Sequence, residues 1–366
     1  MKILHVTNTD VTNDNRIHKQ IKFLNSQNHF FVSSIFIKSE RYNCKNEVAG
    51  VKNVSRKFTL SKHKWIPRTL RHVCNMLELT FFIIIKGSKI KPDIIHAHDT
   101  LVLPAATLLS IFCKSKLIYD AHELESKRNG QNILMSYGSL LIEKICWRRI
   151  NKFITVSDSI VNWYFKKFST KDFEIILNSP INQKLKKTDY LRDKFLIKKN
   201  SNVFIYIGYF SNGRGINHIL DAFSQTDDSN HIVFLGEGEL EEQIKTYSNL
   251  NTNIHHHTPV KYDNVIKIAS SANVGICLIE NTCLSYYFAL PNKLFEYIFS
   301  GLKVIGSDFP EIKKVITKCN AGITCKSNVI SLLEAINKID LKQETVNLES
   351  LSWKYQEKKL LNLYTR

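Results

Sequence analysis

The sequence predicts an α/β protein built from two doubly wound parallel sheets. Short apolar runs that read as buried strands, such as residues 3–7, 116–119 and 203–209, alternate with segments of helical periodicity. A chain of 366 residues is also long for a single core, which favours two domains of about 150–200 residues each.

The composition predicts a soluble, cytoplasmic protein. Its hydrophobic content of 43% is ordinary for a globular protein. The longest apolar run, residues 79–85, is far shorter than the roughly 20 residues that a membrane-spanning helix needs. The first seven residues look like a strand rather than a signal peptide. Eight scattered cysteines without a Cys-x-x-Cys pair fit free thiols in a reducing cytosol.

The net charge of +18 predicts an acidic partner. No nucleic-acid motif is recognisable, so we expect the chain to bind no nucleic acid. Basic residues concentrate between Arg41 and Asp93, where Phe58, Trp65 and Ile66 are interleaved with them. Such a surface suits the anionic inner face of a membrane. The same residues would equally serve as the solvated face of ordinary helices, and the residues alone leave both interpretations open.

Polar clusters follow two successive predicted strands of the first half. His98 and Asp99 end the strand 93–99, and His122 and Glu123 follow the strand 116–119. The carboxyl ends of parallel strands meet at one edge of a doubly wound sheet, where ligands bind. Either cluster alone fits satisfied structural residues, but the two together favour a functional site. The other elements expected in this half are strands at 3–7, 30–37, 153–157 and 174–178, helices at 16–24, 101–113 and 143–151, and one or two helices within 62–92.

Turn-forming residues at 178–182 lead into the charged stretch 183–200, which we interpret as the interdomain linker. The first domain is therefore predicted at 1–180 and the second at 181–350. The last segment, 351–366, is an amphipathic helix by its pattern.

The second half opens with a strand, a glycine-containing loop and a helix. The strand 203–209 contains Gly208, and the loop after it contains Gly213 and Arg214 before a helix that runs to Phe223. Open backbone amides and an arginine at such a loop form a cradle for phosphate.

Metal binding is not expected. Residues 255–257 are three consecutive histidines, but in a strand they point alternately to opposite faces and cannot converge on one ion. No Asp-x-Asp motif ends a strand either.

Residues 290–306 read as a loop, a short helix, a turn and a strand. Pro291 fits the first turn of the helix and Gly301 its end. The amides of Asn292, Lys293 and Leu294 are then open donors at a helix N-terminus, which favours a diphosphate.

Two charged side chains add to this helix start. Lys293 supplies a positive charge at the N-terminus of the helix. The carboxylate of Glu296, one turn further on, can accept hydrogen bonds from the two vicinal hydroxyls of a ribose. On residue types alone, a capped surface helix explains the same segment.

Several segments resemble family 4 of the retaining glycosyltransferases, which have the GT-B fold. The resemblance rests on Leu-Pro-Asn-Lys-Leu-Phe-Glu-Tyr at 290–297, His-Ala-His-Asp at 96–99, Tyr-Asp-Ala-His-Glu-Leu at 119–124 and Asp-Asn-Arg-Ile-x-Lys at 14–19. It covers essentially the whole chain. It implies two facing domains with the site in the cleft between them, and a closing helix at 351–366 that packs back on the first domain.

The resemblance also implies roles for single residues. Glu296 would hold the ribose of a nucleotide-sugar, and His122 would lie beside the donor sugar and the reacting centre. Arg16 would face the cleft, although an exposed arginine in a first helical turn is equally consistent with the sequence. Two departures stand out: Phe288 replaces the glutamate that commonly contacts the sugar, and Tyr209 replaces one of two diphosphate-binding basic residues.

The activity implied is the transfer, with retention, of a hexose-type sugar from a UDP- or GDP-sugar co-substrate to an acceptor hydroxyl. Arg214 and Lys293 would stabilise the leaving diphosphate in place of a metal. The expected acceptor is a lipid-linked oligosaccharide of bacterial surface polysaccharide (O-antigen or capsule) at the inner face of the cytoplasmic membrane. The alternatives are a transferase acting on a small soluble acceptor, a sugar-nucleotide epimerase, and a non-catalytic protein that binds the sugar nucleotide.

Overall fold

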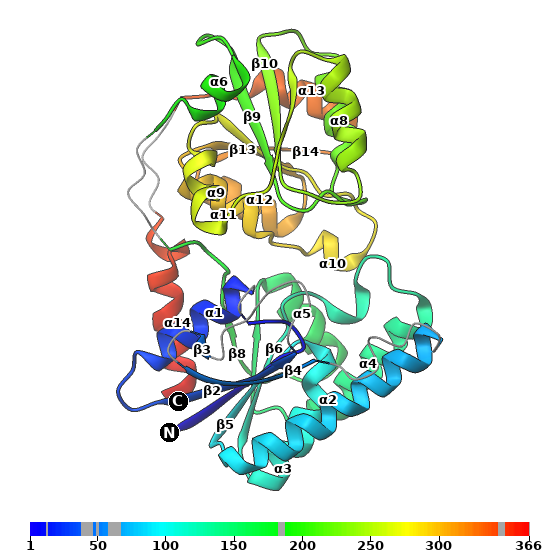
Figure 1. Cartoon of the computed structure of the whole chain (residues 1–366), viewed down its shortest axis with the longest axis vertical. Helices are drawn as coiled ribbons and strands as arrows, with labels where there is room; N and C mark the ends of the chain where they lie inside the picture. The colour runs from blue at the N-terminus through cyan, green and yellow to red at the C-terminus, as the bar shows by residue number, and fades with distance from the viewer. Residues whose placement is uncertain are drawn as a thin grey trace. The chain divides into compact units, whose positions relative to one another are not determined.

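The computed structural model describes residues 1–11, 14–37, 47–48, 51–57, 67–181, 187–342 and 348–365. These residues form two compact units, shown in Figure 1. The first unit comprises Met1–Leu177 and Gln356–Arg366, and the second comprises Asn178–Tyr355. Part of the predicted linker is helical, because α6 (Tyr190–Phe195) forms inside it. Within the basic stretch between Arg41 and Asp93, residues 41–46, 49–50 and 58–66 lie outside the described residues.

The first unit is built on an eight-stranded sheet of order β3-β4-β2-β1-β5-β6-β7-β8. All neighbours are parallel except β3 and β4. The central strands are buried because helices cover both faces. The strands are β1 (Lys2–Val6), β2 (Phe31–Ile37), β3 (Glu47–Val48), β4 (Val51–Arg56), β5 (Ile94–His98), β6 (Lys116–Asp120), β7 (Lys152–Thr155) and β8 (Asp172–Ile175).

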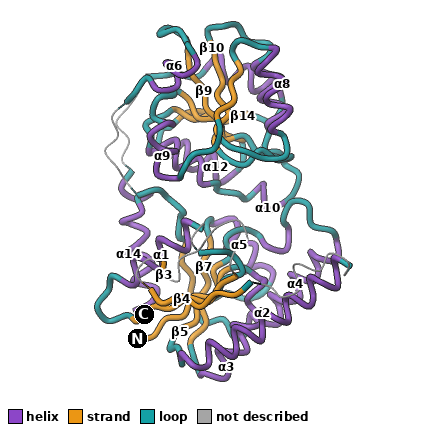
Figure 2. Tube along the Cα trace, viewed as in Figure 1, coloured by secondary structure: helices purple, strands orange, loops and turns teal. Residues whose placement is uncertain are grey.

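The helices that cover this sheet are seen in Figure 2. They are α1 (Asn15–Asn25), α2 (Arg68–Ile90), α3 (Leu103–Cys113), α4 (Ile133–Trp147), α5 (Asp158–Lys167) and α14 (Trp353–Thr365), with short 3-10 turns at Thr100–Val102 and Glu125–Lys127. The Asp14 side chain caps α1 by accepting hydrogen bonds from two backbone amides. Between 67 and 92 the chain forms one helix. No helix among the described residues is long and apolar enough to cross a bilayer.

The predicted helix at 143–151 was wrong in its extent. The structure begins α4 at Ile133, ten residues earlier, where the Asn132 side chain accepts a hydrogen bond from the Met135 amide. The helix ends at Trp147, and residues 148–151 form the turn into β7. The apolar residues in the first turns of α4 are exposed. They therefore do not follow the pattern of apolar residues on one buried face that predicts a helix from the sequence.

The helix α14 packs on the sheet of the first unit. The Tyr364 hydroxyl lies 2.5 Å from Nδ1 of the buried His96. Lys152 on β7 donates to the carbonyl of Leu363 at 2.6 Å. These contacts attach the end of the chain to the strands β5 and β7.

The second unit is built on a six-stranded parallel sheet of order β11-β10-β9-β12-β13-β14. Its strands are β9 (Asn202–Ile207), β10 (Asn230–Leu235), β11 (Ile254–His257), β12 (Val274–Cys277), β13 (Lys303–Ser307) and β14 (Gly322–Cys325). Its longer helices are α7 (Ile216–Phe223), α8 (Glu241–Leu250), α9 (Tyr262–Ala269), α11 (Asn292–Phe299), α12 (Pro310–Lys318) and α13 (Val329–Lys338). The short helix α10 (Leu284–Tyr287) forms between β12 and α11, and the sequence did not predict it.

Tyr297 fixes α11 to the sheet of the second unit. Its fully buried hydroxyl accepts a hydrogen bond from the Ile207 amide on β9 at 2.8 Å and donates to the Ile276 carbonyl on β12 at 3.3 Å. Its ring lies against Gly275, where a Cβ atom would come within 2.2 Å of it. A single side chain therefore holds α11 at the carboxyl end of two central strands.

We expect Tyr297→Phe to lower the free energy of unfolding of the second unit by about 1–3 kcal/mol, because the Ile207 amide would be left buried without an acceptor. Urea unfolding followed by circular dichroism measures the change. The matched control is Tyr137→Phe, whose ring is exposed on α4 and whose loss of a hydroxyl should change stability by less than about 0.5 kcal/mol. Equal stability of the two variants would contradict the role given to Tyr297.

Candidate functional site

The register of the first sheet brings polar residues of three strands together. His5 on β1 pairs with His96 on β5, and His98 on β5 pairs with Asp120 on β6. All four side chains are fully buried at the carboxyl ends of their strands. Of these four, the prediction included His98 as a site residue. His5 was read only as part of a strand, because one histidine in a first strand carries no signal without the register.

Asp120 is the centre of this cluster. Its Oδ1 accepts from Arg16 Nη2 at 2.6 Å, and its Oδ2 accepts from Gln20 Nε2 at 3.1 Å. Burial alone would raise the pKa of Asp120, but the charge of Arg16 and the neighbouring His122 hold it well below its usual range. Arg16 is 5% exposed, so the structure assigns it to a buried ion pair with Asp120 rather than to a solvated helix start.

His122 lies at the edge of the cluster, where its side chain keeps 18% of its surface exposed. Its Nε2 is 3.2 Å from Nδ1 of His98 and 3.6 Å from Oδ2 of Asp120. Its Nδ1 is 3.4 Å from Oδ1 of Asp99. Burial lowers the pKa of His122, but the carboxylates of Asp99 and Asp120 outweigh it and raise the pKa above its ordinary value. The protonated imidazolium is therefore stabilised here.

Asp99 reaches His122 from an unusual backbone position. Its φ of 66° is rare for a residue other than glycine. Its amide donates to the carbonyl of Asp120 at 3.0 Å, which ties the end of β5 to the end of β6. The predicted residues His98, Asp99, His122 and Arg16 are thus brought together in one cluster.

The other histidines of the cluster are held neutral. Burial, with the neighbouring His98, lowers the pKa of His96 to about 3, and burial lowers the pKa of His5 well below its ordinary value. Two groups of side chains, His5–His96–His98 and His98–Asp120–His122, have donor atoms within 4.8 Å of one another and could hold a metal ion. Arg16 already supplies the positive charge that Asp120 requires, so the cluster balances its buried carboxylate with protein groups.

The glycine loop of the second unit follows β9. Gly208, Gly213 and Gly215 have φ values of 129°, 80° and 69°, a backbone that other residues rarely adopt. The carboxylate of Glu280 accepts from the Gly215 amide at 3.2 Å, and the Glu280 amide donates to the Gly213 carbonyl at 3.0 Å. Glu280 therefore shapes this loop, a contact that the sequence did not suggest. Arg214 lies between the two glycines and stacks on the Tyr286 ring, 4.6 Å from its centroid.

Lys293 is buried beside this loop. Its Nζ lies 3.5 Å from the centroid of the Tyr206 ring, and a Cβ at Gly208 would stand 3.6 Å from it. Burial is the main reason that the pKa of Lys293 falls to about 7, and the nearby charge of Arg214 lowers it further. The two cations thus lie within electrostatic range of each other, and an anion between them would relieve their repulsion.

The start of α11 lies at the same edge. The amides of Asn292 and Lys293 have no acceptor among the described residues, as predicted for a helix N-terminus. The amide of Leu294 corrects the prediction, because it donates to the Pro291 carbonyl at 3.1 Å and is not open. Glu296 is buried one turn further on, close enough to Lys293 to oppose the fall of its pKa.

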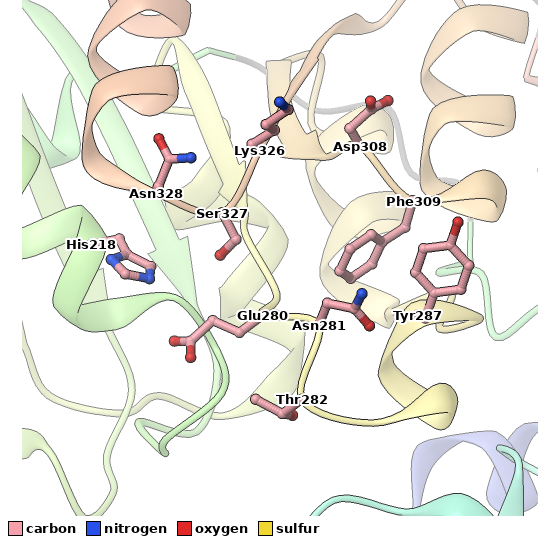
Figure 3. Close-up of a pocket in the computed structure, with 10 residues that line it drawn as sticks. All are labelled: His218, Glu280, Asn281, Thr282, Tyr287, Asp308, Phe309, Lys326, Ser327 and Asn328. Carbon is pink, nitrogen blue, oxygen red and sulfur yellow. The ribbon is translucent and has the colours of Figure 1, made fainter.

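Two cavities open at the carboxyl edge of this sheet. One of about 240 Å³ is lined mainly by apolar atoms and includes Gly208, Tyr209, Pro259 and Val260. The other, of about 520 Å³, is shown in Figure 3, where the rings of Tyr287 and Phe309 lie side by side with Asn281 next to them, whereas the carboxylate of Glu280 points away from these rings, on the side of His218. The first cavity adjoins the predicted site residue Gly208. The second includes none of the predicted site residues.

The three consecutive histidines alternate as predicted. His255 and His257 lie against Phe195, with ring centroids at 4.7 and 6.3 Å, whereas His256 lies near Phe210. No group of ligands that could hold a metal ion occurs here among the described residues.

Comparison with known proteins bears on this second unit. Residues 187–351 match the family described as glycosyl transferases group 1. The second unit carries a glycosyl transferases group 1 domain. The matched residues include the glycine loop, Glu280 and the whole of α11. No curated protein matched the sequence.

The fold of the chain resembles several solved structures. Sucrose-phosphate synthase from Thermosynechococcus elongatus shares 12% identity at a TM-score of 0.76, with 100% of this chain and 98% of that chain covered. HepE from Anabaena, in complex with UDP-glucose, shares 13% identity at a TM-score of 0.71, with 98% of this chain and 92% of that chain covered. UDP-GlcNAc 2-epimerase from Methanocaldococcus jannaschii shares 14% at 0.62, with 100% of both chains covered. The prediction of two Rossmann-like α/β domains of the GT-B type is confirmed.

We expect Asp99→Asn to lower the pKa of His122, because the carboxylate that stabilises its imidazolium would be lost. The measurement is a titration of the histidine ring carbons by NMR, in which the His122 signal of the native chain should show its midpoint above 6.5. Asp172→Asn, a surface carboxylate paired with Lys152, is the matched control and should leave the His122 titration unchanged. An unchanged midpoint in Asp99→Asn would contradict the ion pair.

Proposed function

We propose that the protein is a retaining glycosyltransferase that moves a hexose-type sugar from a UDP- or GDP-sugar to an acceptor hydroxyl. The observation that carries the proposal is the pair of cations Arg214 and Lys293, which converge with a glycine loop and a helix N-terminus at one edge of the glycosyl transferases group 1 domain. A buried lysine and a half-buried arginine next to open amides favour the binding of an anion, and a diphosphate fits this arrangement.

Each part of the nucleotide has a counterpart in the second unit. The apolar cavity beside Gly208 and Val260 suits a planar base. The buried carboxylate of Glu296 suits the two ribose hydroxyls, because it only accepts hydrogen bonds. Arg214, Lys293 and the amides of Asn292 and Lys293 suit the diphosphate. The donor crystallised with HepE, UDP-glucose, has these three parts.

The chemistry requires that charge on the leaving diphosphate be stabilised as the glycosidic bond breaks. In this proposal Arg214 and Lys293 supply that stabilisation without a metal ion. Lys293 is already buried, and the two cations lie against the rings of Tyr206 and Tyr286, so little reorganisation is needed during the reaction. His122, protonated and partly exposed, contributes a positive hydrogen-bond donor to the transferred sugar. Asp99 and His98 position that ring.

For the acceptor we propose a lipid-linked oligosaccharide of a surface polysaccharide, handled at the inner face of the cytoplasmic membrane. The support is the net charge of +18, which favours an anionic surface. The protein would then be cytoplasmic and peripheral to that membrane.

The proposal is tested by a thermal-shift screen with UDP, GDP, ADP, CMP and dTDP, with NAD and short DNA as controls. A ligand that binds only the folded protein raises the unfolding midpoint by mass action. A shift with one nucleoside diphosphate supports the proposal and identifies the base. A shift with DNA alone would overturn it. Release of that nucleotide from a matching sugar donor then separates a transferase from a protein that only binds.

We expect Glu296→Ala to weaken binding of the nucleoside diphosphate by about 1–3 kcal/mol, because charged hydrogen bonds to the ribose would be lost. Isothermal titration calorimetry measures the change. Glu334→Ala, an exposed glutamate on α13, is the matched control and should bind as the native chain does. Native affinity in Glu296→Ala would remove this residue from the ribose site.

We expect His122→Ala to reduce turnover at least tenfold with little change in nucleotide affinity, since the ring acts on the sugar and not on the nucleotide. The measurement compares sugar transfer or donor hydrolysis with calorimetric binding of the nucleoside diphosphate. His29→Ala, at an exposed loop position, controls for the loss of an imidazole. Full turnover in His122→Ala would contradict the assigned role.

Lys293 makes nucleotide binding depend on pH. Its pKa of about 7 means that the free protein loses this charge as the pH rises above 7, whereas a bound diphosphate favours the charged form. Affinity should therefore fall between pH 7 and 9, by up to about tenfold per pH unit. The terminal phosphate is already ionised in this range, so it adds no second step.

Calorimetry at several pH values tests this prediction. Lys293→Met should bind the nucleotide more weakly and lose the pH dependence. Lys338→Met, at an exposed position on α13, should keep the native affinity and its pH dependence. Native and Lys293→Met chains with the same pH profile would show that another group titrates.

A further inference from the structure

The outer surface of three helices in the first unit is apolar. More than half of the exposed large apolar side chains among the described residues belong to α2, α3 and α4. On α2 these are Leu70, Val73, Leu77, Phe81 and Ile85; on α3, Leu108, Ile111 and Phe112; on α4, Ile133, Leu134, Met135, Tyr137, Leu141 and Ile145. We call this surface the α2–α4 face. Soluble monomers rarely expose this many large apolar side chains on neighbouring helices without a partner.

The helix α2 is apolar on two opposite sides. Leu79, Phe82 and Ile83 are buried toward the sheet. The exposed residues recur at intervals of three or four, from Leu70 to Ile85, and so form a stripe along the other side. Phe81, in the middle of the stripe, is 62% exposed. A helix that only covered a core would carry polar residues there.

The three helices form one layer. Gly87 of α2 lies against the Leu109 side chain of α3, and α4 also packs against α3. Right-handed crossovers place α2, α3 and α4 on the same side of the sheet, because the connections β4 to β5, β5 to β6 and β6 to β7 all run in the same direction across it. The helix α3 contacts both α2 and α4. The three helices are labelled in the first unit in Figure 1.

The charges around the α2–α4 face are almost all positive. The only carboxylates in the three helices are Glu78 and Glu143. Glu143 is buried, where it accepts hydrogen bonds from Tyr119 and Thr100. Exposed cations lie at or just beyond the helix ends: Lys86, Lys89, Lys91, Lys114, Lys144 and Arg148. An apolar surface with a cationic border complements an anionic lipid surface.

We propose that the α2–α4 face docks on an anionic lipid bilayer, with its apolar side chains in the headgroup and acyl-chain boundary and its lysines at the phosphates. No described helix could span the bilayer, so the contact is interfacial. A second copy of the chain fits less well, because a two-fold contact would place the same cationic borders opposite each other.

This surface overlaps the one that the sequence suggested, because α2 lies within the stretch between Arg41 and Asp93. Residues 41–46, 49–50 and 58–66 of that stretch lie outside the described residues. The α2–α4 face is defined by exposed apolar residues, and it extends to α3 and α4. The α2–α4 face would hold the protein at the membrane that contains the proposed acceptor, and in that respect the inference rests on the proposed function.

The test is flotation of the full-length chain with vesicles of phosphatidylcholine alone or with phosphatidylglycerol at about one part in three. We expect binding to the anionic vesicles to be at least tenfold stronger than to the neutral ones. Phe81→Asp should reduce that binding at least tenfold, because it places a charge in the apolar stripe. The matched control is Leu250→Asp, an equally exposed apolar position on α8, which should bind as the native chain does.

Three results would overturn the inference: no binding to either vesicle, equal binding by Phe81→Asp and the native chain, or a dimer in solution that Phe81→Asp dissociates. Thermal unfolding of both variants shows that they remain folded, and Lys86→Gln with Lys89→Gln, which retains the apolar stripe, should weaken anionic binding severalfold if Phe81→Asp proves unstable. Nucleotide binding is measured separately, so failure of vesicle binding is distinguishable from failure of the proposed function.

Discussion

The first unit depends on one buried carboxylate. Asp120 has no exposed surface, and an ionised group there is tolerated only because Arg16 and Gln20 bond to it and three histidines surround it. The parallel pairing of β5 with β6 puts Asp120 opposite His98, and the helix α1 brings in both Arg16 and Gln20. The carboxylate of Asp120 also lies beside His122 and raises the pKa of its ring. The buried ion pair of Arg16 and Asp120 therefore helps to set both the position and the charge of His122.

The second unit solves the opposite problem, since it buries positive charge. Lys293 and Arg214 are each held against an aromatic ring, Tyr206 and Tyr286, and neither ring can neutralise them. The pKa of Lys293, lowered to about 7, reflects the unfavourable free energy of burying its charge. In the proposed function, a ligand with two phosphates would relieve the repulsion between the two cations, and their positive charge would stabilise the leaving group.

Sequence reading was most successful where the signal was local. Apolar runs located the central strands, and Gly301 located the end of α11. It failed where local patterns mislead. The exposed apolar start of α4 shows no clear amphipathic period, the short helix α10 has too few residues for one, and the amide of Leu294 turns back to Pro291. Resemblance to a family suggested the candidate site residues, which composition could not do.

The sequence by itself determined the alternation of strands and helices, the class of fold and the residue types available for binding a diphosphate. These follow from periodicity and from turn and capping residues, which act over a few positions. Only the tertiary structure decided that His5 belongs with His98, that Glu280 shapes the glycine loop, that Lys293 is buried, and that the outer side of α2 is exposed. Register, burial and exposure depend on contacts between residues far apart in the chain, so no local pattern can encode them.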